Sequence, residues 1–195
     1  MIKRLFDIVA ALSGIIILSP LLLIIALLIV VDSRGGIFYK QIRVGKDMKD
    51  FYLFKFRTMF SDSDKKGLLT VGMRDSRITK IGYTLRKYKF DELPQLFNVL
   101  NGTMSIVGPR PEVPKYVAMY TAEQKKVLSV RPGITDYASI EYANENAILA
   151  KAENPEELYV KEVMPAKLAL NEKYIQEMGF ATDIKIILKT IGKIL

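Results

Sequence analysis

The chain has 195 residues, of which 29 are Lys or Arg and 21 are Asp or Glu, so its formal net charge is +8. Half of the residues are hydrophobic, which excludes an open, disordered nucleic-acid tail, and the positive charge favours anionic partners such as phosphates or an anionic membrane surface. His and Cys are both absent, which excludes disulfides, thiolate nucleophiles and imidazole bases. Any catalysis must therefore use carboxylates, cations or hydroxyls, and any metal is expected to be a hard ion such as Mg²⁺.

An uncharged segment of 24 residues runs from Ile8 to Val31. As a straight helix it would be about 36 Å long, enough to span a hydrocarbon core of about 30 Å. The segment is too long for the apolar region of a cleaved signal peptide and does not end at small residues. We therefore predict a retained membrane segment over residues 1–34, followed by a compact domain over residues 35–195.

Ser19 and Pro20 lie at the middle of this segment. Proline removes a helical hydrogen bond, so a kink or a break is expected there. Basic residues flank both ends of the segment: Lys3 and Arg4 before it, and Arg34, Lys40, Arg43 and Lys46 after it. The positive-inside rule places both ends in the cytoplasm, which a re-entrant hairpin satisfies and a straight span does not. Hydrophobic length still favours crossing, so the residues alone support both topologies about equally.

The following residues predict an α-rich α+β domain. Two β-rich runs, over 37–43 and 51–57, flank a polar turn at 45–47 and predict a β-hairpin. Helical spacing and an Asn-Gly stop signal predict the next helices. A loop is expected over 61–67, and helices over 78–88, 91–100 and 121–129.

The last stretch, residues 183–195, has lysines four residues apart at Lys185, Lys189 and Lys193. Apolar residues form the opposing stripe: Ile184, Ile187, Leu188, Ile191 and Leu195. This pattern predicts a basic amphipathic helix. Such a helix suits a membrane interface, and it equally suits a surface helix that packs on the core.

Asp91 and Glu92, followed by Leu93-Pro94, open the helix predicted over 91–100. Capping is the commoner explanation, since acids and Pro are typical of a helix start. A helix N-terminus also stabilises anions and presents N–H groups to phosphate. Because neighbouring helical residues point about 100° apart, the two carboxylates are expected to have separate roles. One would be the nucleophile or metal ligand, and the other a supporting acid or base.

Several cations could neutralise a phosphate near these carboxylates. Arg110 lies between two prolines, and Arg131 precedes Pro-Gly, so both guanidinium groups stand on stiff loops. Lys55 and Arg57 share one face at the end of the second strand, and Arg43 on the facing strand could join them. Solvated surface positions are the alternative for each of these cations.

Taken in order, these segments resemble the small monotopic phosphoglycosyl transferases of the bacterial sugar transferase family. The resemblance covers nearly the whole chain. Its elements are Lys3–Asp7, Ser19-Pro20, Gln41–Gly45, Lys55–Met59, Leu85–Lys87, Asp91–Leu96, Asn98–Gly102, Met104–Pro111 and Arg131–Thr135.

The resemblance implies transfer of a sugar 1-phosphate from a UDP-sugar to polyprenyl (undecaprenyl) phosphate, the first membrane step of glycoconjugate assembly. Asp91 would attack the sugar-bearing phosphate, release UMP and hold a phosphosugar covalently. Mg²⁺ would act at Asp91, with Glu92 in support. Lys55 and Arg110 would neutralise phosphate, and Glu156 loosely matches a further acid of the family.

The resemblance also implies a membrane topology and a set of partners. The break at Ser19 and Pro20 would make the membrane helix re-entrant, with amphipathic interfacial helices and the catalytic domain (residues 35–195) on the cytoplasmic face of the inner membrane. The expected partners are the UDP-sugar, polyprenyl phosphate and membrane lipid, without nucleic acid. A homodimer is among the oligomeric states that the sequence allows.

One segment departs from the family pattern. After Arg131–Thr135 many members continue with Gly-Trp-Ala-Gln, whereas this chain has Asp136-Tyr137-Ala138-Ser139, so recognition of the sugar or nucleotide there is open. Two alternatives to the leading interpretation remain. One is a non-enzymatic membrane adaptor that binds anionic lipid or nucleic acid, and the other is a single-pass anchor on a similar enzyme.

Overall fold

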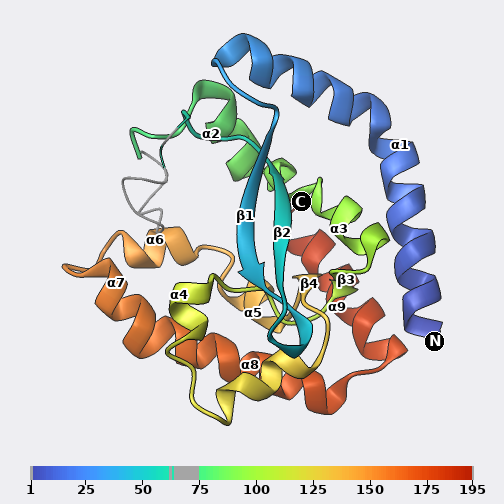
Figure 1. Ribbon diagram of the computed structural model, residues 1–195, viewed down its shortest axis with the longest axis vertical. Coiled ribbons are helices and arrows are strands. Elements are labelled where there is room, and N and C mark those ends of the chain that lie inside the picture. Colours follow the sequence, from blue (N-terminus) through green and yellow to red (C-terminus); the bar gives the residue numbers. More distant parts are fainter. Residues whose placement is uncertain (1, 62, 64–74, 195) are drawn as a thin grey trace.

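The computed structural model describes residues 2–61, 63 and 75–194, without the side chain of Ile194. The described part is rich in helix and contains two small sheets (Figure 1), as predicted for the fold class. The strands are β1 (Phe38–Val44), β2 (Asp50–Phe56), β3 (Ser105–Val107) and β4 (Gly133–Thr135). The α-helices are α1 (Ile2–Asp32), α2 (Lys80–Lys87), α3 (Gln95–Asn101), α4 (Pro114–Val117), α5 (Tyr137–Glu141), α6 (Glu145–Leu149), α7 (Pro155–Leu158), α8 (Met164–Glu177) and α9 (Phe180–Ile194).

Helix α1 is continuous over 31 residues although Pro20 lies inside it, and it bends along its length (Figure 1). Pro20 has no N–H to offer to the carbonyl of Ile16, four residues earlier. The hydroxyl of Ser19 donates to that carbonyl at 2.8 Å instead. The break predicted at Ser19 and Pro20 is therefore a bend within a continuous helix, because the serine supplies the missing donor.

The surface of α1 suits a lipid environment. Among the described helices it is the one whose length and composition allow it to cross a membrane, and only 11% of its most apolar window is buried against the protein. The helix ends at Asp32, near the domain boundary predicted at residue 34. These features are compatible with membrane association and leave open whether the helix crosses or turns back.

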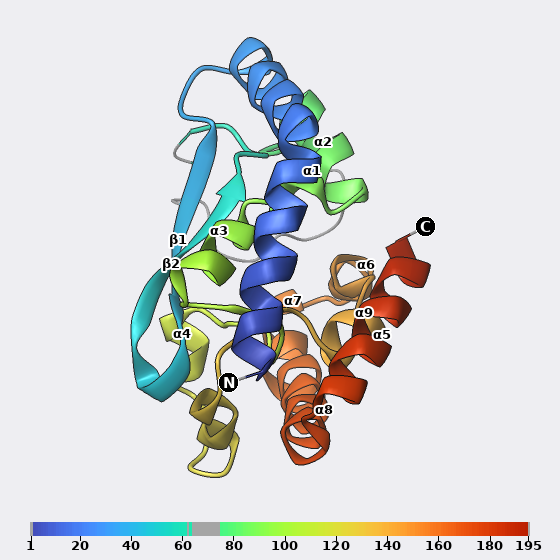
Figure 2. The same cartoon turned by 90° about the vertical axis from the view of Figure 1, so that its right-hand side faces the viewer.

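The first turns of α1 lie beside the compact domain (Figure 2), and polar side chains attach them to it. Arg4 donates to the carbonyls of Val99 and Leu100, in the last turn of α3, at 2.7 and 3.0 Å. Asp7 is buried and accepts the backbone N–H of Ile106 in β3 at 3.0 Å. Lys3 forms an ion pair with the buried Asp183 of α9 at 2.5 Å. The beginning of the membrane helix is therefore fixed to three elements of the compact domain.

The predicted hairpin is confirmed as the antiparallel pair β1–β2, in which Tyr39 lies opposite Lys55. The helix predicted over 78–88 is confirmed as α2. The helix predicted over 121–129 is instead a 3₁₀ segment, Gln124–Ser129. Most of the loop predicted over 61–67 lies outside the described residues.

The helix predicted from Asp91 to Leu100 is divided into two parts. A 3₁₀ turn covers Phe90–Glu92, and α3 begins only at Gln95. Pro94 explains the division, because it has no N–H to donate to the carbonyl of Phe90. Helix α3 ends, as predicted, at a left-handed Gly102 with φ of 87°. Asp91 therefore lies in a tight turn before the helix and does not cap it.

Strands β3 and β4 are parallel and hold two loops side by side. A Cβ atom on Gly133 would lie 2.1 Å from the backbone nitrogen of Gly108, so only glycine allows this approach. The loop after β3 contains Arg110, and the segment after β4 contains Asp136. The close pairing therefore brings the segment that follows β4 next to Arg110.

Helix α9 combines the two arrangements considered for residues 183–195: it packs on the core and also has an exposed basic and apolar surface. Ile186 is fully buried against the core. Leu188 and Ile191 are 64% and 49% exposed, and Lys185, Lys189 and Lys193 are exposed as well. Leu195 of the predicted stripe lies outside the described residues. One face of the helix thus packs on the protein, while another presents apolar and basic side chains outward.

Candidate active site

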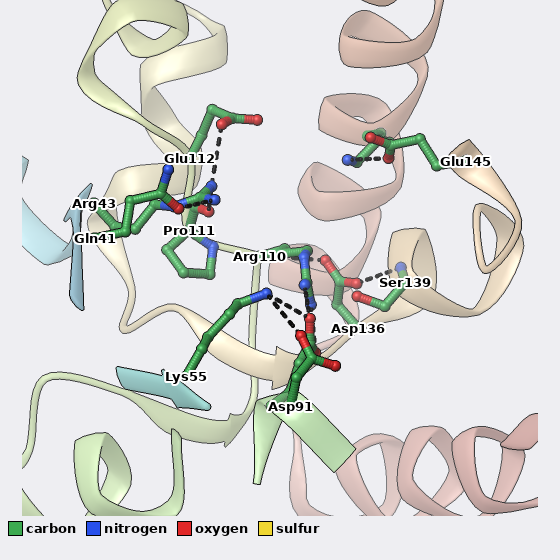
Figure 3. Close-up of polar contacts among 12 residues, drawn as sticks. Gln41, Arg43, Lys55, Asp91, Arg110, Pro111, Glu112, Asp136, Ser139 and Glu145 are labelled. Atoms are coloured by element: carbon green, nitrogen blue, oxygen red, sulfur yellow. Dashed lines mark hydrogen bonds and ion pairs between the residues drawn. The ribbon is translucent and has the colours of Figure 1, made fainter. Parts of the chain in front are cut away.

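Four of the predicted site residues meet at the turn before α3 (Figure 3). The Nζ atom of Lys55, near the end of β2, lies 2.9 Å from Oε1 of Glu92 and 4.0 Å from Oδ2 of Asp91. Arg110, from the loop after β3, donates to Glu92 through both terminal nitrogens, one of them at 3.2 Å. Three separate segments thus bring two carboxylates and two cations together.

The two carboxylates differ in their bonding. Glu92 accepts hydrogen bonds from Lys55 and Arg110, and these two cations outweigh its burial and hold its pKa well below the ordinary value. Asp91 is 6% exposed and accepts no hydrogen bond from any residue that the structure describes. Burial raises the pKa of Asp91, although Lys55 opposes this shift. A carboxylate without hydrogen bonds keeps its lone pairs available for attack on an electrophile.

Two opposing effects act on the pKa of Lys55. Burial lowers this pKa, and the charges of Glu92 and Asp91 oppose the shift.

Arg86, in the last turn of α2, is a further cation near the site. Its charge lowers the pKa of Asp91, and its Nε donates to Thr58 at 3.1 Å. The sequence analysis did not single out Arg86 as a site residue. The available signal was a cation in the last turn of the helix that leads to the carboxylates.

Arg43 supports the Arg110 loop and does not point at the carboxylates (Figure 3). Its Nε and Nη2 donate to the side chain of Gln41 at 3.0 and 2.7 Å, and Nη1 donates to the carbonyl of Pro111 at 2.9 Å. It also forms an ion pair with Glu112 at 3.2 Å. Its contacts therefore hold the residue that directly follows Arg110.

The structure does not bring the other three predicted phosphate-binding residues to Asp91. Arg57 is buried and makes four hydrogen bonds to residues 33–36 at the end of α1, at 2.6–2.9 Å. Arg131 is exposed and donates to the carbonyl of Gly102 at 2.9 Å. Glu156 pairs at the surface with Lys115. Arg57 directly follows β2, and its N–H still donates to the carbonyl of Ile37 at 2.9 Å, but its guanidinium is occupied by its four contacts to residues 33–36.

Asn98, which was not predicted as a site residue, connects α3 to the strand that carries Lys55. This fully buried side chain of α3 accepts the backbone N–H of Phe54 at 2.9 Å and donates to the carbonyl of Tyr52 at 2.7 Å. It therefore pairs with β2 as a neighbouring strand would. The strand that carries Lys55 is thereby fixed to the helix that follows Asp91. An amide between the apolar residues Phe97 and Val99 of the predicted helix was the available signal.

A magnesium ion would find limited but suitable ligands at this site. Among the described residues no group of three acidic side chains could hold a metal ion. Mg²⁺, however, is commonly bound through one or two carboxylates together with substrate phosphates and water. The carboxylate of Asp91, which accepts no hydrogen bond from a described residue, fits that mode, whereas Glu92 is already paired with two cations.

Comparison with known proteins identifies the family. Residues 1–195 match the family described as "Bacterial sugar transferase". The chain is 37% identical over 194 residues to the "Uncharacterized sugar transferase EpsL" of Bacillus subtilis, with all of this chain and 87% of the relative covered.

Two further relatives have names that state a reaction. The chain is 37% identical over 199 residues to the "UDP-N-acetylgalactosamine-undecaprenyl-phosphate N-acetylgalactosaminephosphotransferase" of Aeromonas hydrophila, covering all of this chain and 44% of the relative. It is 38% identical over 198 residues to the "Undecaprenyl-phosphate glucose phosphotransferase" of Komagataeibacter xylinus, covering 98% of this chain and 35% of the relative. The chain thus spans less than half the length of these two relatives. The protein belongs to the bacterial sugar transferase family and is a membrane-associated transferase.

Proposed function

We propose that this protein transfers a sugar 1-phosphate from a UDP-sugar to undecaprenyl phosphate through a covalent intermediate on Asp91. The observation that carries the proposal is the buried carboxylate of Asp91, which accepts no hydrogen bond from a described residue and lies 4.0 Å from Lys55, one of the two cations that Glu92 holds. The names of both relatives support undecaprenyl phosphate as the acceptor, and the name of the Aeromonas hydrophila relative supports a UDP-sugar as the donor.

In the first step an oxygen of Asp91 attacks the phosphorus that carries the sugar. The new bond joins Asp91 to this phosphorus, and the bond to the bridging oxygen of the diphosphate breaks, so UMP leaves with both bonding electrons. The ionised carboxylate is the reactive form. Lys55 lies 4.0 Å from Asp91, where its charge favours that form and would neutralise charge on the phosphoryl oxygens.

In the second step the phosphate of the lipid acceptor attacks the same phosphorus. The bond to Asp91 breaks, the carboxylate is regenerated, and the sugar is left on a polyprenyl diphosphate. A two-step route lets a soluble donor and a lipid acceptor use one site in turn. Neither step requires His or Cys, both of which the chain lacks.

Glu92 has a supporting role in this proposal. It holds Lys55 and Arg110 within hydrogen-bonding distance of one carboxylate, so both cations stand at the place where a diphosphate must bind. The phosphoryl oxygens can share these donors when the substrate enters. Mg²⁺, held by Asp91 and substrate phosphate oxygens, would supply further charge neutralisation.

The proposed membrane arrangement is a re-entrant α1 at the cytoplasmic face of the inner membrane. Basic residues flank both ends of the helix, and the Ser19–Pro20 bend lets the helix turn within the bilayer without an unpaired Ile16 carbonyl. The exposed apolar and basic side chains of α9 would rest at the interface. Labelling a residue added before Met1 from either side of the membrane tests this. Labelling of that residue from the periplasmic side only would contradict it.

The decisive assay measures UMP release from a panel of UDP-sugars, with undecaprenyl phosphate and Mg²⁺ present. We expect release with at least one donor by the wild type, and none above background by the Asp91→Asn variant. The surface variant Glu157→Gln, whose exposed carboxylate pairs with Lys161 and accepts a hydrogen bond from Asn154, is the matched control and should keep wild-type activity. A panel without UMP release by the wild type would contradict the proposal.

A further inference from the structure

Asp136 connects the segment after β4 to the backbone of Arg110 (Figure 3). Its side chain is fully buried, and its two carboxylate oxygens have different partners. Oδ1 accepts the backbone N–H of Ser139 at 2.6 Å and so caps α5. Oδ2 accepts the backbone N–H of Arg110 at 3.1 Å. One carboxylate thus holds a helix start and a site loop at the same time.

This second contact adds to the backbone pairing between the segments that follow β3 and β4. Val107 pairs with Thr135, and the N–H of Gly108 donates to the carbonyl of Thr135 at 3.0 Å. Pro109 accepts the N–H of Gly133 at 3.0 Å through its carbonyl but has no N–H of its own to donate. The Asp136 side chain then accepts the next N–H, that of Arg110. The loop is therefore fixed on both sides of its first proline.

We propose that Asp136 is a positioning residue that fixes the backbone of Arg110 and thereby directs its guanidinium to the substrate diphosphate. The diphosphate part of this inference rests on the function proposed above.

A helix cap alone does not explain the choice of Asp. Ser and Asn cap helices about as well as Asp does. Two N–H donors converge on this side chain, and each bonds its own carboxylate oxygen, whereas serine or asparagine has a single acceptor oxygen, which cannot occupy both positions. The variant Asp136→Ser therefore separates the two roles, because it keeps a cap for α5 and loses the reach to Arg110.

The experiment compares the wild type, Asp136→Ser and the control Asn154→Ala, which removes a cap at the start of α7 away from Arg110. Hydrogen–deuterium exchange of the peptide that contains Arg110 should rise at least about tenfold in Asp136→Ser and stay unchanged in Asn154→Ala, since a lost hydrogen bond of about 1.4 kcal/mol or more corresponds to that factor. Unchanged exchange in Asp136→Ser would overturn the inference, whatever the substrate.

A second arm measures binding of UDP. Asp136→Ser should weaken binding about tenfold in the wild-type background and have little effect in an Arg110→Gln background, because the effect passes through Arg110. Equal weakening in both backgrounds would overturn the positioning role. A wild type that binds no UDP and releases no UMP would refute the proposed function instead, and the exchange result would still decide whether Asp136 fixes the Arg110 loop.

Discussion

Asp91 and Glu92 are neighbours in the chain and approach the same lysine, but Lys55 is 2.9 Å from Glu92 and 4.0 Å from Asp91. Arg110 adds two hydrogen bonds to Glu92. The pairing divides the two acids by function, because Glu92 organises the cations while Asp91 keeps a buried carboxylate free of hydrogen bonds from described residues. This division leads to opposite expectations for the two amide variants.

Replacing Asp91 by Asn should increase the free energy of unfolding at pH 7 while it abolishes activity. Burial raises the pKa of Asp91 in the folded state, so ionisation at neutral pH disfavours folding. The stability gain should shrink as the pH falls below the pKa and disappear below the unfolded-state value of about 3.9, where the wild type is protonated in both states. Denaturant unfolding in detergent at pH 7 and pH 4 measures this. A variant less stable than the wild type at pH 7 would contradict it.

Replacing Glu92 by Gln should instead destabilise the protein by about 3–5 kcal/mol, because Lys55 and Arg110 lose their shared counter-ion in a buried place. The two cations depress the pKa of Glu92 below its ordinary 4.5. Its contribution is therefore complete above that value and is lost as the pH falls through the depressed folded-state pKa. Denaturant unfolding at pH 7 checks the loss, with Glu157→Gln expected within about 0.5 kcal/mol of the wild type. If Glu92→Gln lowered the free energy of unfolding by no more than the control variant does, the counter-ion role would be refuted.

The Asn98→Leu variant should lower the free energy of unfolding by about 2–4 kcal/mol, because two buried backbone groups of β2 lose their partners. It should also weaken UDP binding, since Lys55 is no longer held against the turn with Asp91. Unfolding and UDP titration measure the two effects. Asn101→Ala, in the exposed last turn of the same helix, is the control and should cost less than about 1 kcal/mol. Loss of stability without weaker UDP binding would limit Asn98 to a structural role.

Arg57→Lys tests whether this arginine anchors α1 or binds phosphate. One ammonium group cannot replace a guanidinium that makes four hydrogen bonds to residues 33–36. We expect a stability loss of about 1–3 kcal/mol and a UDP affinity within about twofold of the wild type, whereas Lys55→Ala should weaken UDP binding at least about tenfold. Unchanged stability with UDP binding as weak as in Lys55→Ala would return Arg57 to the phosphate-binding set.

Much of the fold followed from local patterns in the sequence. The hairpin, α2, the end of α3 at Gly102 and the long apolar α1 are each governed by nearby residues. The helix predicted from Asp91 was wrong in its start, because Pro94 divides it. At Ser19 and Pro20, where a kink or a break was expected, α1 bends, and the hydroxyl of Ser19 keeps it continuous.

The site was predictable in composition and less so in arrangement. Because the chain has no His or Cys, Asp91 and Glu92 were the leading catalytic candidates, and the prolines on both sides of Arg110 predicted a cation on a rigid loop. The contacts of Arg57 and Asn98 are made across 21 or more positions in the chain. No local pattern reveals such partners, so the anchoring role of Arg57 and the role of Asn98 emerge only in the folded molecule.

The most direct test of the central claim is intact-protein mass spectrometry after incubation with the accepted UDP-sugar and Mg²⁺, without the lipid acceptor. We predict an adduct with the mass of one sugar phosphate, located on Asp91 by peptide mapping and removed when undecaprenyl phosphate is added. The Asp91→Asn variant should carry no adduct. Near-normal turnover by Asp91→Asn, or an adduct on another residue that the lipid acceptor removes, would contradict the assignment of Asp91 as the nucleophile.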